Sequence, residues 1–296
     1  QYFKDSDDGE EYLYSDHEPA SCHKGFPCFD QPDLKATYEF MAIVPQGWSV
    51  FSNAEEASTA DQITNPDQYD LAIREFGVED ITEFTSGFGE EKTAYFQFER
   101  SPHMSTYLYA FIAGPYANIS SDNEDIRSYR YPLALHCRKS LAKHLERSKE
   151  DYFNVTKAGI DHYEVMFGTK YPWGKLNQAF VPDYSMGAME NVGMVVYRDE
   201  YIEREQRFSE TKKENIMNTF LHEISHMWFG NLVTMKWWDD LWLNESFANF
   251  VSYICLDEAP GLEQYKNAWS IFLDESFWGL GEDQKDTTHP ISLDVI

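Results

Sequence analysis

The sequence predicts an α+β fold, with a strand-rich domain over residues 1–124 and a domain of long helices and a few strands over residues 125–296. Two observations carry this prediction. Up to about residue 121, apolar residues form short runs rich in aromatic and β-branched side chains, which end at Gly, Pro or Asn. After the polar stretch 120–125, apolar residues recur at helical spacing over much longer segments. The change in pattern places the domain boundary at this polar stretch.

Each element follows from its local pattern. In the first domain, strands are expected at 38–44, 48–52, 93–98 and 107–112. In the second domain, strands are expected at 131–137, 176–181 and 193–197, and helices at 140–166, 210–229 and 241–256. Residues 283–290 read as a polar loop. No internal repeat interrupts this order.

Composition excludes several classes of protein. The 296 residues include 24 Lys and Arg against 51 Asp and Glu, which gives a formal net charge of −27. Nucleic acids and anionic membranes bind cationic surfaces, so neither is an expected partner. A hydrophobic fraction of 42% argues against disorder. No run approaches the roughly 18 apolar residues of a membrane-spanning helix, and none is expected.

The cellular compartment is left open by the sequence. Four cysteines are too few for a disulfide framework, although Cys22 and Cys28 are close enough in sequence to pair. The first residue is Gln1, and no signal-peptide pattern follows it. A cytoplasmic location is favoured, with a secreted or membrane-anchored full-length form as the alternative.

The main chemical signal is His222-Glu223-Ile-Ser-His226. On a helix, residues four apart differ by about 400°, so both imidazoles lie on one face and reach one metal ion. Catalytic zinc sites use three protein ligands and keep a fourth position for water. Glu223 lies beside the first histidine, where it would reach that water as a general base.

A third ligand is expected from Glu245. It lies 18 residues beyond the second histidine, within the apolar helix predicted at 241–256. Two histidines and a glutamate form one of the known catalytic zinc sets. We therefore expect one Zn²⁺ per chain, held by His222, His226 and Glu245.

A third motif makes the resemblance to a known family specific. Gly187-Ala188-Met189-Glu190-Asn191 precedes the His-Glu-x-x-His motif. Together with a glutamate 18 residues further on, this arrangement resembles the M1 family of zinc aminopeptidases, the gluzincins. The segments 18–19, 26–36, 228–234 and 237–238 resemble the same family, so the likeness covers essentially the whole chain.

The resemblance implies a fold and a set of roles. The fold would be part of an N-terminal β-saddle domain followed by a thermolysin-like zinc peptidase domain. Glu190 and Glu18 would bind the free α-amine of a peptide, with Gly187, Ala188 and Met189 beside them in the substrate site. An ammonium group needs such anionic partners in a pocket that contains little water.

The expected function is therefore that of a zinc-dependent aminopeptidase, which hydrolyses the N-terminal bond of peptides with a free N-terminus through a metal-activated water. Glu223 would take the proton of that water and pass it to the leaving amine. Two alternatives are a non-catalytic, peptidase-like component of an assembly and an epoxide hydrolase of the same family.

The sequence departs from the family pattern in two ways. Asp16 stands where the family usually has Gln, next to His17 in place of an aromatic residue. If Asp16 joins Glu18 and Glu190, the excess negative charge would favour N-terminal Arg or Lys; otherwise Asp16 faces solvent and apolar contacts set the preference.

The second departure concerns length. The family's transition-state tyrosine lies well downstream of the third ligand, and only 51 residues follow Glu245 here. Tyr253 and Tyr265 are too close to Glu245 for that role. We therefore expect this chain to be a fragment that begins and ends within domains.

Overall fold

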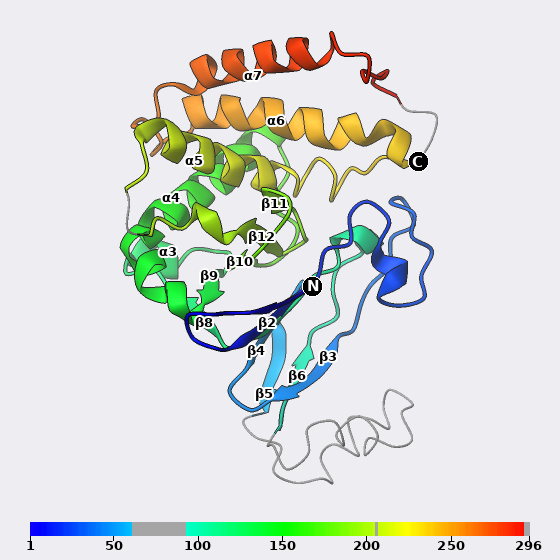
Figure 1. Ribbon diagram of the computed structural model, residues 1–296, viewed down its shortest axis with the longest axis vertical. Coiled ribbons are helices and arrows are strands. Elements are labelled where there is room, and N and C mark those ends of the chain that lie inside the picture. Colours follow the sequence, from blue (N-terminus) through cyan, green and yellow to red (C-terminus); the bar gives the residue numbers. More distant parts are fainter. Residues whose placement is uncertain (61–92, 205–206, 293–296) are drawn as a thin grey trace.

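The computed structural model describes residues 1–60, 93–204 and 207–292. The strands of the N-terminal region lie at one end of the molecule, and helices α4–α7 are stacked at the other (Figure 1). The predicted α+β fold class is confirmed. All four cysteines, including Cys22 and Cys28, are free thiols.

The described residues of the N-terminal region form two antiparallel sheets. The first has the strand order β1-β2-β7-β4 and consists of β1 (Tyr2–Lys4), β2 (Glu11–Tyr14), β7 (Phe111–Gly114) and β4 (Ser49–Ser52). The second has the order β3-β6-β5 and consists of β3 (Met41–Pro45), β6 (Thr93–Phe98) and β5 (Glu56–Ala60). The strand predicted at 107–112 is wrong in its first half. Thr106–Leu108 form a 3₁₀ turn, because their side chains are buried together rather than alternating between two faces.

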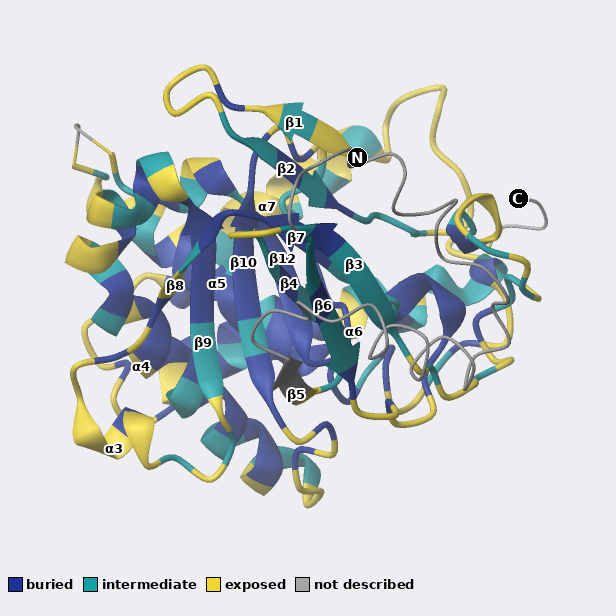
Figure 2. Ribbon diagram, turned by 90° about the horizontal axis from the view of Figure 1, so that it is seen from below, coloured by how far each residue is buried: buried dark blue, intermediate teal, exposed yellow. Residues whose placement is uncertain are grey.

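A mixed five-stranded sheet supports the helices. Its order is β11-β12-β10-β9-β8, with bounds Ala188–Met189, Met194–Arg198, Leu176–Val181, Leu133–Arg138 and Tyr116–Ile119. Strands β9, β10 and β12 are parallel, whereas β8 and β11 pair antiparallel at the edges. Figure 2 shows β10 almost entirely buried, as expected for a strand covered on both faces. The sheet includes β8, so it begins before residue 124, where the sequence places the domain boundary. The boundary itself stays a prediction.

The α-helices among the described residues are α3 (Glu124–Arg127), α4 (Ala142–Phe167), α5 (Glu210–Ser225), α6 (Leu241–Glu258) and α7 (Ala268–Glu282). Helix α5 ends four residues earlier than predicted, and the chain then turns through Gly230 at φ +111°. Helix α7 has no counterpart among the predicted elements. None of the described helices combines the length and apolar character that a membrane crossing requires.

Close packing between α4 and α5 fixes the helix that carries the histidines. A Cβ atom at Gly159 of α4 would lie 2.8 Å from Leu221 Cδ2, so a larger residue here would require the Leu221 side chain to shift. The Tyr163 hydroxyl donates a hydrogen bond to the Leu221 carbonyl at 2.9 Å. On the other side, Phe220 stacks on Tyr197 of β12 with ring centroids 4.2 Å apart. Residues on both flanks of α5 are therefore held by a buried core, which is dense enough to fix their positions.

Buried polar contacts join the N-terminal sheets to the mixed sheet. The Lys175 ammonium donates to the carbonyls of Ser52 and Gly193, both at 2.9 Å. The Asn53 amide donates to the Val192 carbonyl at 2.9 Å. A Cβ atom at Gly193 would lie 2.6 Å from the Asn53 carbonyl oxygen, so the two backbones approach closely here. These contacts hold the end of β4 against the mixed sheet.

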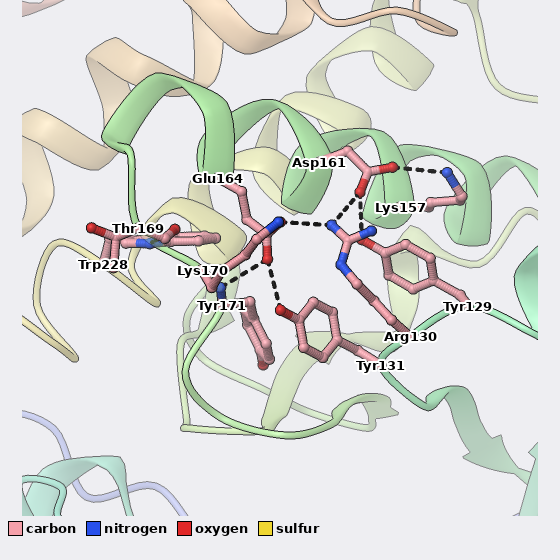
Figure 3. A network of polar contacts seen from close by, with 10 residues as sticks. All are labelled: Tyr129, Arg130, Tyr131, Lys157, Asp161, Glu164, Thr169, Lys170, Tyr171 and Trp228. Atoms are coloured by element: carbon pink, nitrogen blue, oxygen red, sulfur yellow. Dashed lines mark hydrogen bonds and ion pairs between the residues drawn. The ribbon is translucent and has the colours of Figure 1, made fainter.

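A network of charged and aromatic side chains covers the C-terminal half of α4 (Figure 3). Glu164 lies at its centre and is almost fully buried, although Arg130 and Lys170, both within 2.8 Å, are more exposed. Glu164 also accepts hydrogen bonds from the Tyr131 hydroxyl and the Tyr171 amide. Burial would raise the pKa of Glu164, but the hydrogen bond from Lys170, those from Tyr171 and Tyr131, and the charge of Arg130 outweigh it and lower the pKa to about 2.

Glu164→Gln should therefore destabilise the protein in a pH-dependent way. A folded-state pKa below the ordinary value of 4.5 means that Glu164 contributes stability above pH 4.5, and that this contribution disappears as the pH falls towards about 2. We expect a loss of about 1 kcal/mol at pH 7, because the partners are partly solvent-screened. Urea unfolding of the wild type and of Glu164→Gln at pH 7 and pH 2.5 measures this difference in the free energy of unfolding. Glu124→Gln, a change at an exposed carboxylate, is the control, and an equal effect of both variants would contradict the account.

Candidate metal centre and substrate cavity

The two predicted histidines lie at the end of α5 with their ring nitrogens facing each other. His222 Nε2 and His226 Nε2 are 2.8 Å apart, although His226 is already the residue that caps the helix. The amide of His226 still donates to the His222 carbonyl at 3.2 Å, so the helical spacing is retained. Glu245, the fifth residue of α6, places carboxylate oxygens 3.4 Å from His222 Nε2 and 3.8 Å from His226 Nε2.

These three residues fit a metal ion. One donor atom from each lies within 4.8 Å of the others. His226 uses Nδ1 for hydrogen bonding, 2.7 Å from Asn244 Oδ1 and 3.0 Å from the Phe229 carbonyl oxygen. Both partners are acceptors, so Nδ1 carries the proton and Nε2 keeps its lone pair for a metal. Two imidazole nitrogens and one carboxylate are the donor set of a catalytic zinc site.

Glu223 is buried beside this donor set, with a relative exposure of 5%. One of its carboxylate oxygens, Oε2, is enclosed and has no hydrogen-bond partner among the described residues. Burial, followed by the negative charges of Glu190 and Glu245, raises the pKa of Glu223. A carboxylate with a raised pKa holds a proton more readily, which suits a general base.

Two further carboxylates approach the same centre. Glu190 directly follows β11 and is 3% exposed; its carboxylate comes within 4.8 Å of His226 and Glu223. Glu18 comes from the loop after β2, and its carboxylate lies within 4.8 Å of Glu190 and Glu245. Burial and the charge of Glu190 raise the pKa of Glu18 well above its ordinary value. The structure thus brings Glu18 of the N-terminal region beside Glu190 and Glu245 of the helical region.

These side chains line one cavity of about 420 Å³. Its other lining residues are Met186, Gly187, Ala188, Tyr201, Asn215, Asn218, Thr219, Asn249, Tyr253 and Glu275. Glutamates come from the loop after β2, the position directly after β11, and helices α5, α6 and α7, whereas no Lys or Arg is among the described lining residues. The cavity is therefore strongly anionic and suited to bind cations.

Met189 and Asp16, two of the predicted substrate-site residues, do not line this cavity. Met189 is 1% exposed and packs in the hydrophobic core, because alternate side chains of β11 point to opposite faces. Asp16 lies along a different, more apolar cavity between the N-terminal sheets, where its Oδ2 is 3.4 Å from Gln1 Nε2. The structure thus does not bring Asp16 into the Glu18–Glu190 pair on which the expected preference for N-terminal Arg or Lys depended.

Several lining residues escaped the sequence analysis. Asn249 is one helical turn beyond Glu245, so the i, i+4 rule could have placed it on the same face. Tyr253, which was given no role, lies one further turn along α6. Tyr201 and Glu275 come from elements distant in sequence, and no local signal points to them.

Comparisons with known proteins agree with the arrangement. A family model described as the Peptidase M1 N-terminal domain matches residues 1–76, and one described as the Peptidase family M1 domain matches residues 152–296. The chain is 37% identical to Aminopeptidase N of Streptomyces lividans over 294 residues, 99% of this chain and 30% of that protein.

Two further relatives are similarly related. The chain is 33% identical to a probable aminopeptidase 1 of Sulfurisphaera tokodaii over 290 residues, which cover 97% of this chain and 32% of that protein. It is also 33% identical to Aminopeptidase M1 of Arabidopsis thaliana over 279 residues, 94% of this chain and 27% of that protein. The chain therefore spans about a third or less of the length of these relatives.

Proposed function

Because this chain belongs to peptidase family M1, we propose that the protein is a zinc-dependent aminopeptidase that releases single residues from the N-terminus of peptides. One observation carries the proposal. A single cavity contains a zinc-type donor set, the buried carboxylate of Glu223, and two further carboxylates, Glu18 and Glu190. The aminopeptidase names of the matched relatives favour this activity over an epoxide hydrolase.

Charge complementarity supports the substrate class. Neither Glu18 nor Glu190 is needed as a metal ligand or as the general base. No lysine or arginine among the described lining residues neutralises their charge. The α-ammonium group of a peptide would supply the missing positive charge, and ion pairing is strong in a cavity from which water is excluded. Fixing the ammonium beside the metal set restricts cleavage to the first peptide bond.

In the proposed mechanism, different residues bind the metal, transfer the proton and hold the substrate. A zinc ion held by His222, His226 and Glu245 would polarise the carbonyl of the first peptide bond and acidify a water molecule. Glu223 takes the proton from that water and delivers it to the leaving amine. Glu18 and Glu190 hold the ammonium, so the carbonyl next to it meets the water in a reproducible position.

The proposal is tested by two matched substrates. The zinc-loaded protein should hydrolyse leucine linked to a fluorophore and should not measurably hydrolyse the N-acetylated form. Acetylation removes the positive charge but leaves the scissile bond unchanged. Equal hydrolysis of both would contradict the aminopeptidase proposal, and hydrolysis of neither would favour the non-catalytic alternative.

Glu190→Gln should raise KM for aminoacyl substrates by about tenfold or more, because the variant loses a charge-assisted contact with the ammonium. The shape of the side chain is kept, so folding and zinc affinity should change little. Steady-state kinetics measure the effect. Asp16→Asn is the matched control, since Asp16 lies outside the cavity. A KM that changes equally in both variants would remove Glu190 from its assigned role.

A further inference from the structure

We infer that Asn244 is a positioning residue that links the amine-binding carboxylate to a metal ligand. Asn244 directly precedes Glu245 on α6 and is 1% exposed. Its Nδ2 donates to Glu190 Oε1 at 3.0 Å, and its Oδ1 lies 2.7 Å from His226 Nδ1. The inference rests on the proposed function, because the roles of Glu190 and His226 come from it.

The chemistry of the partners fixes the direction of both hydrogen bonds. A carboxylate only accepts, so the amide nitrogen of Asn244 must face Glu190. The amide oxygen then faces His226 and accepts from Nδ1–H, which leaves the lone pair on Nε2. Glu190 thereby determines the orientation of the amide, and the amide determines the tautomer of the histidine. A single side chain transmits the position of one functional group to the other.

The loop after α5 is built around this amide. Gly230 has φ +111°, and a Cβ atom there would lie 2.0 Å from Asn244 Oδ1, so no other residue fits without displacing the amide. The next residue, Asn231, donates to the Glu190 backbone carbonyl at 2.8 Å. The same two-residue segment therefore holds Asn244 from one side and the backbone of Glu190 from the other.

The link also leaves Glu190 ready for substrate. Oε1 is occupied by Asn244, whereas Oε2 accepts no hydrogen bond from the described residues. One oxygen is thus held by the protein and the other is available to the ammonium. Without the amide, the carboxylate would be free to rotate towards His226 or Glu223, both of which it approaches within 4.8 Å.

Two substitutions separate the two halves of the link. Asn244→Asp keeps an oxygen for His226 Nδ1–H but removes the donor to Glu190 and sets two carboxylates side by side. We expect zinc affinity to stay within about threefold of wild type, and KM to rise about tenfold or more. Asn244→Ala removes both contacts, so zinc affinity should also fall by about 10–100-fold. Zinc affinity is measured by competition with a chromogenic chelator, and KM with leucine linked to a fluorophore.

Asn267→Ala is the control for zinc affinity, because it removes an asparagine that also donates to a glutamate, Glu214, but lies outside the cavity. Asn244→Asp preserves size, so it tests the inference even if Asn244→Ala does not fold. Wild-type zinc affinity and KM in Asn244→Asp and Asn244→Ala would overturn the inference. An Asp variant that loses zinc but keeps its KM would also overturn it, because the direction of both bonds would be wrong. If the wild-type protein itself binds no zinc or cleaves no substrate, the proposed function fails instead.

Discussion

Glu223→Gln should lower kcat by about 10²–10⁴-fold while zinc affinity stays close to that of the wild type. The substitution keeps the size of a side chain that is only 5% exposed, so the fold should be preserved. It removes the carboxylate whose pKa burial and two neighbouring charges raise. The proton of the attacking water then has no base of comparable strength in reach. Steady-state kinetics with leucine linked to a fluorophore measure the change in kcat.

The expected effect is on kcat rather than on KM, since Glu223 is not assigned to the ammonium. The comparison with Glu190→Gln is therefore informative, because that variant should change KM rather than kcat. Turnover by Glu223→Gln at the wild-type rate would assign the proton transfer to another group.

Glu245→Ala should abolish tight zinc binding and reduce hydrolysis by about 10³-fold or more. The metal contributes several kcal/mol of stabilisation to charge that develops on the carbonyl, and each 1.36 kcal/mol corresponds to a tenfold change in rate. The variant leaves two histidines, which bind zinc weakly on their own. Metal content after dialysis and residual activity give the two readouts.

Glu258→Ala is the matched control, since Glu258 is an exposed residue at the other end of the same helix. It should retain zinc and turnover. If Glu245→Ala also retained one tightly bound zinc per chain, the assignment of Glu245 as the third ligand would be wrong.

The parts of the site that could be predicted from the sequence depend on local periodicity. The spacing of His222 and His226 requires only a helix, and that helix persists to the capping residue even though it ends earlier than expected. Glu245 followed from its separation and its apolar surroundings. The strands 93–98 and 176–181 were also predictable, because their β-rich composition coincides with burial in a sheet.

The parts that could not be predicted depend on tertiary packing. Asp16 and Glu18 are two residues apart, yet only Glu18 reaches the cavity, because the chain between them turns away from the strand direction. Asn244 is an ordinary helix residue until Glu190 and Gly230 are brought against it. Helix α7 carries apolar residues around much of its circumference, with Gly279 and Gly281 near its end, so its pattern has no clear face.

The central claim is that hydrolysis depends on one metal ion at the His222–His226–Glu245 set and on a free α-amine. The most direct test strips the protein with a chelator and then titrates zinc back while following hydrolysis of leucine linked to a fluorophore. We predict that activity disappears on stripping and returns in full at one zinc per chain, and that the N-acetylated substrate stays uncleaved throughout. Hydrolysis that continues unchanged in the fully metal-free protein would contradict the claim.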